Sequence, residues 1–359
     1  MRYPKFLEAH DTIGFVAPSF GCSTEPYKSA FNNALKKFSE KGFFTVCGPN
    51  VYASHGVGIS ATPKECGEEF TNAYVQNNSS VSSRPNASSA SCASDVLISC
   101  GGGELMCEIL GSVDFEKVRE ATPKWFMGYS DNTNLTFLLP TLCDTAAIYG
   151  PCAPAFGMEP WHEAIEDAFA LLQGKKLSMK GYPLYETETL KDETHPLEPY
   201  NVTEKRHISA FNGNEKIEET SFSGRLIGGC LDCLANLVGT KYDRVREFNE
   251  RYREDGVIWF LEACDLNVFS IRRAIWNLKN AGWFEQAKGF LIGRPLAGQE
   301  EMFGLDNHKA VMAMLQDLQV PVLMDLDIGH LPPMMPLISG AMANVRLQGQ
   351  EMEVEFLLR

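Results

Sequence analysis

The sequence predicts an α/β fold with a parallel sheet covered by helices on both faces, and three observations support this prediction. Short apolar segments alternate with helix-like segments through the first 150 residues. The strand-like segments are almost entirely apolar, which is typical of strands buried on both faces of a parallel sheet. The chain has 359 residues, too many for one ordinary core, so two domains are expected.

Residues 1–170 are expected to form the first domain. Its first helix, 26–42, keeps its apolar residues on one face and ends at Gly42, as helices commonly do. The remaining segments are strands at 12–19, 95–100, 124–129 and 146–150, and helices at 103–111 and 132–142.

Two polar stretches interrupt this pattern. "NNSSVSSRPNASSASCAS" (77–94) is rich in Ser and Asn and has no periodicity, so we interpret it as a mobile surface loop. Residues 171–220 are polar and contain prolines, and we interpret them as a linker or excursion between the domains.

Residues 221–359 are expected to form the second domain. The stretch "GRLIGGCLDCLANLVG" predicts a strand, a turn and a helix, and the alternating pattern about Gly349 predicts a terminal β-hairpin. Further strands are predicted at 257–263, 287–293 and 320–330, and helices at 268–282 and 307–318.

The composition argues against several classes of function. The net charge of −14 disfavours nucleic acid as a partner, because an acidic surface repels phosphates. We expect neither a secretory signal nor a membrane span, since no apolar run is suited to either. The 11 cysteines are scattered through apolar runs, which suits reduced thiols in a cytoplasmic protein better than a disulfide framework.

Ser130 lies in "FMGYSDNTNLTFLL" (126–139), between a strand-like and a helix-like run. One interpretation is a nucleophile on a tight turn, and Gly128 two residues earlier supplies the small residue that such a turn needs. The second glycine of a G-x-S-x-G elbow is absent, because Asn132 occupies that position. The other interpretation is an ordinary helix cap. Both fit the local sequence.

The stretch "CGGGEL" (100–105) also lies between a strand and a helix. Its glycines allow a backbone to approach a ligand closely and present N–H groups, as an oxyanion hole or anion cradle does. It lacks the G-x-G-x-x-G spacing and the lysine of a P-loop, so nucleotide binding is weakly supported. A tight turn between strand and helix is the alternative.

Glu262 and His330 each end an apolar strand-like run. The carboxyl ends of parallel strands are where α/β proteins place their sites, and a buried carboxylate needs a partner. Histidine is the usual general base near neutral pH. The alternatives are a glutamate emerging into solvent and a histidine on a surface loop.

Two weaker metal or redox hypotheses remain open. Cys230 and Cys233 form a C-x-x-C without a second pair of ligands, and their helical spacing among leucines favours a core position. Asp325 and Asp327 lie close to His330 in sequence and could supply metal ligands with it.

Taken together, these segments resemble the LD-carboxypeptidase-like serine peptidases, a family that includes the microcin C immunity peptidases. The resemblance rests on "DTIGFVAPS", "ISCGGGELMCEIL", "MGYSDNTNL", "IYGP", "GRLIGGCLDCLANLVGT", "VIWFLEACD", "AKGFLIGR" and "DIGHLPPMMPLISGA", which occur in the family's order through nearly the whole chain.

This resemblance implies a Rossmann-like N-terminal domain carrying the nucleophile and a swivelling or barrel-like, β-rich α/β C-terminal domain. It implies a catalytic triad of Ser130, Glu262 and His330. It also implies an oxyanion hole from the N–H of Asp131 and one from Gly102 or Gly103. No metal or cofactor is required, and the family favours a homodimer.

The chain departs from the familiar carboxypeptidase pattern, in which Gly-Gly-Tyr-Gly stands where this sequence has Gly-Gly-Gly-Glu. The expected substrate is therefore either a muropeptide cut by an L,D-carboxypeptidase or a peptidyl-nucleotide amide of the microcin type. A non-catalytic α/β module that binds an anionic ligand on the glycine-rich loop is the alternative function.

Overall fold

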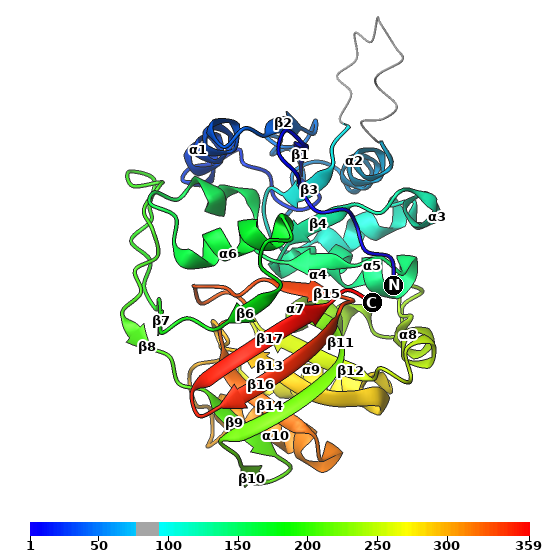
Figure 1. Cartoon of the computed structure of the whole chain (residues 1–359), viewed down its shortest axis with the longest axis vertical. Coiled ribbons are helices and arrows are strands. Elements are labelled where there is room, and N and C mark those ends of the chain that lie inside the picture. The colour runs from blue at the N-terminus through cyan, green and yellow to red at the C-terminus, as the bar shows by residue number, and fades with distance from the viewer. Residues whose placement is uncertain (77–92) are drawn as a thin grey trace, which may run out of the picture. The chain divides into compact units, whose positions relative to one another are not determined.

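The computed structural model describes residues 1–76 and 93–359 (Figure 1). Residues 77–92, which make up most of the Ser/Asn-rich stretch, lie outside the described residues. The chain divides into two compact units. We call Arg2–Lys176 with Leu190–Tyr200 the N-terminal unit, and Met1, Leu177–Thr189 and Asn201–Arg359 the C-terminal unit.

The N-terminal unit contains parallel strands in the order β5-β4-β3-β1-β2. Consecutive strands of this order pair in parallel, so each crossover must run over a face of the sheet. The bounds are β1 Thr12–Val16, β2 Phe44–Cys47, β3 Val96–Ser99, β4 Trp125–Gly128 and β5 Ala147–Tyr149.

Helices cover both faces of this sheet. Neighbouring residues of β1 point to opposite sides, and the apolar side chains on each side pack against helices. Phe15 packs against Phe31 and Phe38 of α1, whereas Val16 belongs to a core cluster with Phe70 of α2. Figure 1 shows α1 and α6 on one side of these strands and α2 and α3 on the other. The helices are α1 Tyr27–Glu40, α2 Pro63–Val75, α3 Phe115–Glu120, α4 Thr133–Thr136, α5 Leu138–Cys143 and α6 Glu163–Leu172.

Two predicted helices of this unit differ from the structure. The segment 103–111 forms a short 3₁₀ helix, η2 Met106–Gly111, and the segment 132–142 is divided into η3 Ser130–Asn132, α4 and α5. The second difference has a local cause. Pro140 lies in the first turn of α5, where its missing N–H leaves no helical hydrogen bond unmade, whereas in one continuous helix it would break one. A further 3₁₀ helix is η4 Ala153–Gly157.

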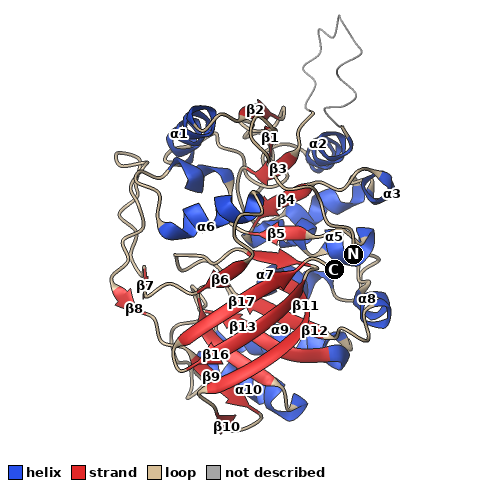
Figure 2. Cartoon of the chain, viewed as in Figure 1, coloured by secondary structure: helices blue, strands red, loops and turns tan. Residues whose placement is uncertain are grey.

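The C-terminal unit is built on a nine-stranded sheet in the order β10-β9-β14-β13-β12-β11-β16-β17-β6, and Figure 2 draws its strands in red. The central strands β14, β13, β12 and β11 pair in parallel, and the outer strands pair antiparallel. The bounds are β6 Ser178–Lys180, β9 Ser209–Asn212, β10 Glu215–Lys216, β11 Glu219–Cys230, β12 Val257–Glu262, β13 Ala287–Gly293, β14 Pro321–Leu326, β16 Met342–Gln348 and β17 Glu351–Leu357.

The polar stretch 171–220, interpreted above as a linker or excursion, contributes β6, β9 and β10 to this sheet. Its remaining strands, β7 Leu184–Tyr185 and β8 Glu204–Lys205, pair with each other. The other elements of the unit are α7 Leu231–Leu237, α8 Val245–Arg251, α9 Val268–Asn280, η5 Trp283–Gln286, α10 Asn307–Leu315, η6 Gln316–Leu318 and β15 Leu337–Ser339.

Strand β11 places residues for the site, because its two halves have different partners. Its first half pairs antiparallel with β16, and its last half pairs parallel with β12. The parallel register makes Cys230 the partner of Glu262 at the carboxyl ends of the two strands. Two sequence-distant side chains are thereby fixed next to each other.

Aromatic residues fill the core of the C-terminal unit. Trp259 of β12 and Trp283 of η5 are fully buried and stack with 5.6 Å between ring centroids. Phe284 packs edge-on against both Trp259 and Phe290. Such pairs contribute about 0.5–1.5 kcal/mol beyond simple burial.

The ten cysteines within the described residues are all free thiols. No helix in the described part of the chain is both long enough and apolar enough to cross a membrane.

Candidate active site

Ser130 lies two residues after the end of β4 and adopts a left-handed backbone conformation with φ of 62°. A non-glycine residue in this region costs of order 1–3 kcal/mol and is found preferentially at functional sites. Its N–H donates a hydrogen bond to the Tyr149 hydroxyl at the end of β5, with an N–O distance of 3.2 Å. Ser130 is half-buried, so it lies on an accessible, tightly held turn between strand and helix.

The glycine-rich segment lies against this turn. A Cβ added at Gly102 would be 2.9 Å from Cβ and 3.0 Å from Oγ of Ser130, so this position needs a glycine. Gly103 has φ of 154° and packs against Ser19 and Phe20. Within the described residues, neither Gly102 nor Gly103 donates a backbone hydrogen bond, which leaves both N–H groups available to a ligand.

The side chain of Asp131 ties three segments together behind Ser130. Its buried carboxylate accepts hydrogen bonds from Ser19 Oγ at 2.6 Å, from Met106 N at 2.9 Å and from Asn134 Nδ2 at 3.2 Å. These partners belong to the loop after β1, to the start of η2 after the glycine-rich segment, and to α4. Asp131 therefore fixes the glycine-rich segment relative to the turn that carries Ser130.

Glu262 and His330 form a hydrogen-bonded pair in the C-terminal unit. The distance between Glu262 Oε2 and His330 Nδ1 is 2.8 Å, and the Glu262 side chain is fully buried at the end of β12. A carboxylate can only accept, so Nδ1 carries the proton and Nε2 is left as the basic nitrogen. This is the arrangement in which a carboxylate orients an imidazole to act as a general base.

The pKa of His330 reflects two opposing effects. Burial by itself lowers the pKa of the imidazole, but the Glu262 carboxylate and the contact with Cys264 outweigh it, and the pKa of His330 is raised well above its ordinary value. The pair therefore stabilises the imidazolium form that arises when the base takes up a proton.

Two glycines leave room for the Glu262 carboxylate. A Cβ at Gly329, whose φ is 106°, would lie 2.5 Å from Glu262 Oε2, and a Cβ at Gly293 would lie 3.0 Å from Glu262 Cβ. The "DIGH" and "LIGR" segments quoted above thus place glycine where a larger residue would displace the acid from His330.

A buried ion pair anchors the segment that leads to His330. Arg294 forms a salt bridge with Asp327, and its guanidinium also donates to the carbonyl oxygen of Asp325 at 2.8 Å. Asp327 Oδ2 additionally accepts from Tyr182 N at 2.7 Å. Sequence reasoning did not single out Arg294. A charged residue directly after the apolar strand "AKGFLIG" is the sequence feature that could have indicated a buried ion pair there.

The metal hypothesis that combined His330 with Asp325 or Asp327 is not supported by these contacts. Asp325 pairs with His308 at 2.8 Å, and Asp327 is occupied by Arg294. In the described chain, the three acidic, thiol or imidazole residues whose donor atoms gather close together are instead Cys230, Glu262 and His330.

Asp232 and three cysteines lie near the carboxyl ends of β11 and β12. Asp232 Oδ2 accepts from Cys230 Sγ at 3.2 Å and from Cys264 N at 3.0 Å, and its Oδ1 accepts from Asp265 N at 2.9 Å. Cys230 and Cys233 are both buried, and burial raises the pKa of the Cys230 thiol well above its ordinary value. Cys264 lies beside His330.

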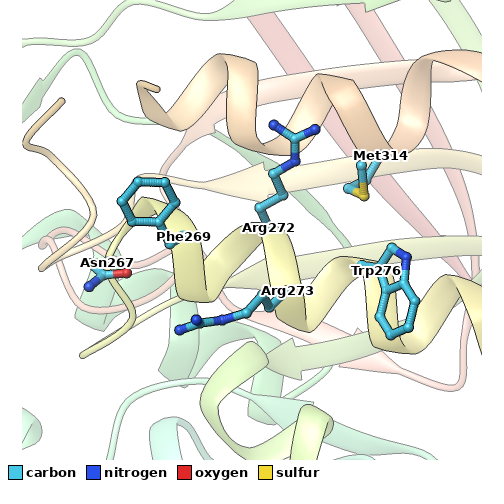
Figure 3. A pocket seen from close by; sticks show the side chains of 6 residues that line it. All are labelled: Asn267, Phe269, Arg272, Arg273, Trp276 and Met314. Carbon is cyan, nitrogen blue, oxygen red and sulfur yellow. The ribbon is translucent and has the colours of Figure 1, made fainter. Parts of the chain in front are cut away.

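A pocket of about 510 Å³ lies elsewhere in the C-terminal unit, on α9 (Figure 3). Its lining residues are Asn267, Phe269, Arg272, Arg273, Trp276 and Met314. None of them is a carboxylate, thiol or imidazole, so this pocket offers no general base, and we do not assign the reaction to it.

The structure defines an α/β protein with a serine on a strained turn in its N-terminal unit and a buried Glu–His pair in its C-terminal unit. Family models identify it further. The model of the LD-carboxypeptidase N-terminal domain matches residues 86–150, and that of the LD-carboxypeptidase C-terminal domain matches residues 223–345. The two matches together span just over half of the sequence. The chain belongs to the LD-carboxypeptidase family, which confirms the resemblance described above.

Curated relatives match over nearly the full length. The microcin C7 self-immunity protein MccF of Escherichia coli is 28% identical, over 93% of this chain and 90% of its own. A probable murein peptide carboxypeptidase of Bacillus subtilis is 24% identical, over 95% of this chain and 90% of its own.

Solved structures confirm the predicted fold class. An MccF-like protein from Bacillus anthracis superimposes with a TM-score of 0.79 at 20% identity, covering 100% of both chains. MccF in complex with glutamyl sulfamoyl guanosine superimposes with a TM-score of 0.76 at 20% identity, covering 99% of both.

Proposed function

We propose that this chain is a serine peptidase or amidase that uses Ser130, Glu262 and His330 to hydrolyse a small peptide or peptide-like amide. The observation that carries the proposal is the 2.8 Å hydrogen bond between Glu262 and His330 in a member of a peptidase family. A buried carboxylate that accepts from Nδ1 orients the imidazole of a catalytic triad and stabilises the imidazolium that forms during the reaction.

In the proposed mechanism, His330 Nε2 removes the proton of the Ser130 hydroxyl as Oγ attacks the substrate carbonyl carbon. The N–H groups of Asp131 and of Gly102 or Gly103 stabilise the negative oxygen of the tetrahedral intermediate. The imidazolium then gives its proton to the leaving amine, and an acyl-enzyme remains on Ser130. Water, activated by the same imidazole, hydrolyses this ester and restores the enzyme.

Two substrate classes follow from the relatives. One relative bears the name of a murein peptide carboxypeptidase, and another that of a microcin C7 self-immunity protein. Structures of the latter hold aminoacyl sulfamoyl nucleosides. For this chain we propose an acyl group followed by a small leaving amine, supplied either by a muropeptide or by a peptidyl-nucleotide.

The test compares an L,D-tetrapeptide with a processed microcin-type aminoacyl nucleotide, each incubated with the full chain and followed by mass spectrometry. We expect wild-type protein and Ser39→Ala, an exposed serine on α1, to cleave one of the two. We expect Ser130→Ala to cleave neither while keeping its fold by circular dichroism. A fluorophosphonate probe is expected to label wild type but not Ser130→Ala.

Full hydrolysis by Ser130→Ala would exclude the proposed nucleophile. Saturable binding of either compound without turnover or probe labelling would instead favour the non-catalytic binding module.

We also propose that the active protein is a cytoplasmic homodimer. Light scattering after gel filtration measures the number of chains per particle directly.

A further inference from the structure

We propose that the C-terminal unit contains a zinc site formed by Cys230, Glu262 and His330, and that occupation of this site switches off the proposed peptidase. The site itself is independent of the proposed function. Only the inhibitory consequence rests on it, because Glu262 and His330 belong to both.

The first argument is geometric. One donor atom from each of the three side chains lies within 4.8 Å of the others. Tetrahedral zinc with bonds of about 2.0–2.3 Å to O, N and S separates its ligand atoms by roughly 3.3–3.6 Å. Side-chain shifts of about 1 Å or less would therefore complete the coordination. The backbone is already fixed, since Cys230 and Glu262 are register partners in β11 and β12.

The second argument is the chemistry of the donors. A thiolate, an imidazole and a carboxylate are the ligands that zinc accepts, and three protein ligands leave a fourth position for water. Magnesium and calcium prefer oxygen donors and do not suit a thiolate with an imidazole. The set therefore selects a borderline-soft divalent ion.

The third argument is the surroundings of the donors. Cys230 and Glu262 are each 1% exposed, so the ion would bind in a site with little competing water. Asp232 accepts from Cys230 Sγ and also braces the Cys264–Asp265 backbone. Outer partners of this kind orient metal ligands and affect affinity by about 10–100-fold.

The functional consequence follows from the shared residues. Zinc ligated by His330 and Glu262 removes the base and its orienting carboxylate from the triad. Hydrolysis therefore stops without any change to Ser130, and a chelator restores it.

The test uses chelator-treated, full-length protein and Co²⁺ as a spectroscopic probe for Zn²⁺. We expect one Co²⁺ per chain with a thiolate-to-metal charge-transfer band in the near ultraviolet, which Zn²⁺ abolishes by displacement. Cys230→Ser is expected to lose that band. Cys230→Ser and His330→Ala are each expected to bind Co²⁺ at least about tenfold more weakly, because losing a direct ligand should cost more affinity than losing a residue that only hydrogen-bonds to a ligand.

Two controls separate this site from the proposed function and from loose binding by surface thiols. Cys47→Ser removes an exposed thiol and should leave the Co²⁺ band unchanged. Ser130→Ala should be inactive and yet bind Co²⁺ as the wild type does. Circular dichroism checks that every variant is folded.

Equal Co²⁺ spectra and affinities for wild type and folded Cys230→Ser would overturn the site, whether or not the chain hydrolyses peptides. If Zn²⁺ binds but hydrolysis is unchanged or faster, the inhibitory part is wrong. Inhibition of the wild type that a chelator reverses and that is weakened in Cys230→Ser, relative to the zinc-free rate of that variant, supports both parts.

Discussion

The backbone of Ser130 is strained, because its φ of 62° brings Cβ close to the following carbonyl oxygen. Replacing Ser130 with glycine removes the conflict between Cβ and the backbone, whereas alanine retains it. We expect both variants to be inactive and the glycine variant to be more stable than the alanine variant by about 1 kcal/mol. Urea denaturation of the two variants measures this difference. A more stable Ser130→Ala would show that the turn is relaxed.

Gly102 is the second position where a single atom matters. An added methyl group would lie within 3.0 Å of Ser130 Oγ and would displace either the hydroxyl or the glycine-rich segment. We expect Gly102→Ala to lower kcat by about 10²–10³-fold, the range for loss of one oxyanion donor. Steady-state kinetics test this expectation, and an unchanged kcat in the folded variant would remove Gly102 from the site.

At the residue scale, sequence reasoning singled out Ser130, Glu262 and His330 because each directly follows or ends an apolar strand. It did not find the Ser19–Asp131 hydrogen bond, since those residues are 112 positions apart and neither is unusual locally. It also could not exclude Asp325 and Asp327 as metal ligands. Their actual partners, His308 and Arg294, become neighbours only when the sheet forms.

The segment between β14 and β15 is held by the Arg294–Asp327 pair, so this contact decides how firmly His330 is placed. Arg294→Met leaves a buried, uncompensated carboxylate, which costs about 3–5 kcal/mol. We expect a large fall in the midpoint of thermal unfolding and a lower kcat from the folded fraction. The exposed Arg346→Met on β16 is the matched control and should change stability by less than about 0.5 kcal/mol. Equal stability of the two variants would contradict the anchoring role.

At the element scale, the buried parallel strands were predictable because burial on both faces requires apolar residues throughout. The divided helix after Ser130 was less so, since apolar periodicity continues across Pro140. The strands between 171 and 220 escaped prediction for a different reason. β6, β9 and β10 are short outer strands of a sheet whose other members lie far along the chain, and polar residues are ordinary at such an edge.

At the scale of the whole molecule, pH should affect folding through Glu69 of α2. Its buried carboxylate accepts from Ala17 N and Asn50 N, each at 2.9 Å, yet burial dominates and raises the pKa of Glu69 to about 7. Its pKa in the unfolded chain is close to the ordinary 4.5. The native state therefore binds more protons between these two values, and stability falls as pH rises through this window.

We expect this single carboxyl to lower the free energy of unfolding by up to about 3 kcal/mol between pH 4.5 and pH 7. Urea denaturation at several pH values measures the slope, and Glu69→Gln should flatten it. Glu68→Gln, an exposed neighbour on the same helix, should keep the wild-type slope. Identical slopes for all three proteins would place the pKa of Glu69 near its ordinary value.

The stacked indoles of Trp259 and Trp283 offer an optical marker for this chain. Because their ring centroids lie only 5.6 Å apart, we expect the electronic transitions of the two indoles to couple and to produce a paired positive and negative band in circular dichroism. Both rings belong to the C-terminal unit, whereas the buried Trp125 belongs to the N-terminal unit. The paired band should fade when the C-terminal unit melts. Comparing that loss with the far-ultraviolet signal would reveal whether the two units unfold together or in sequence.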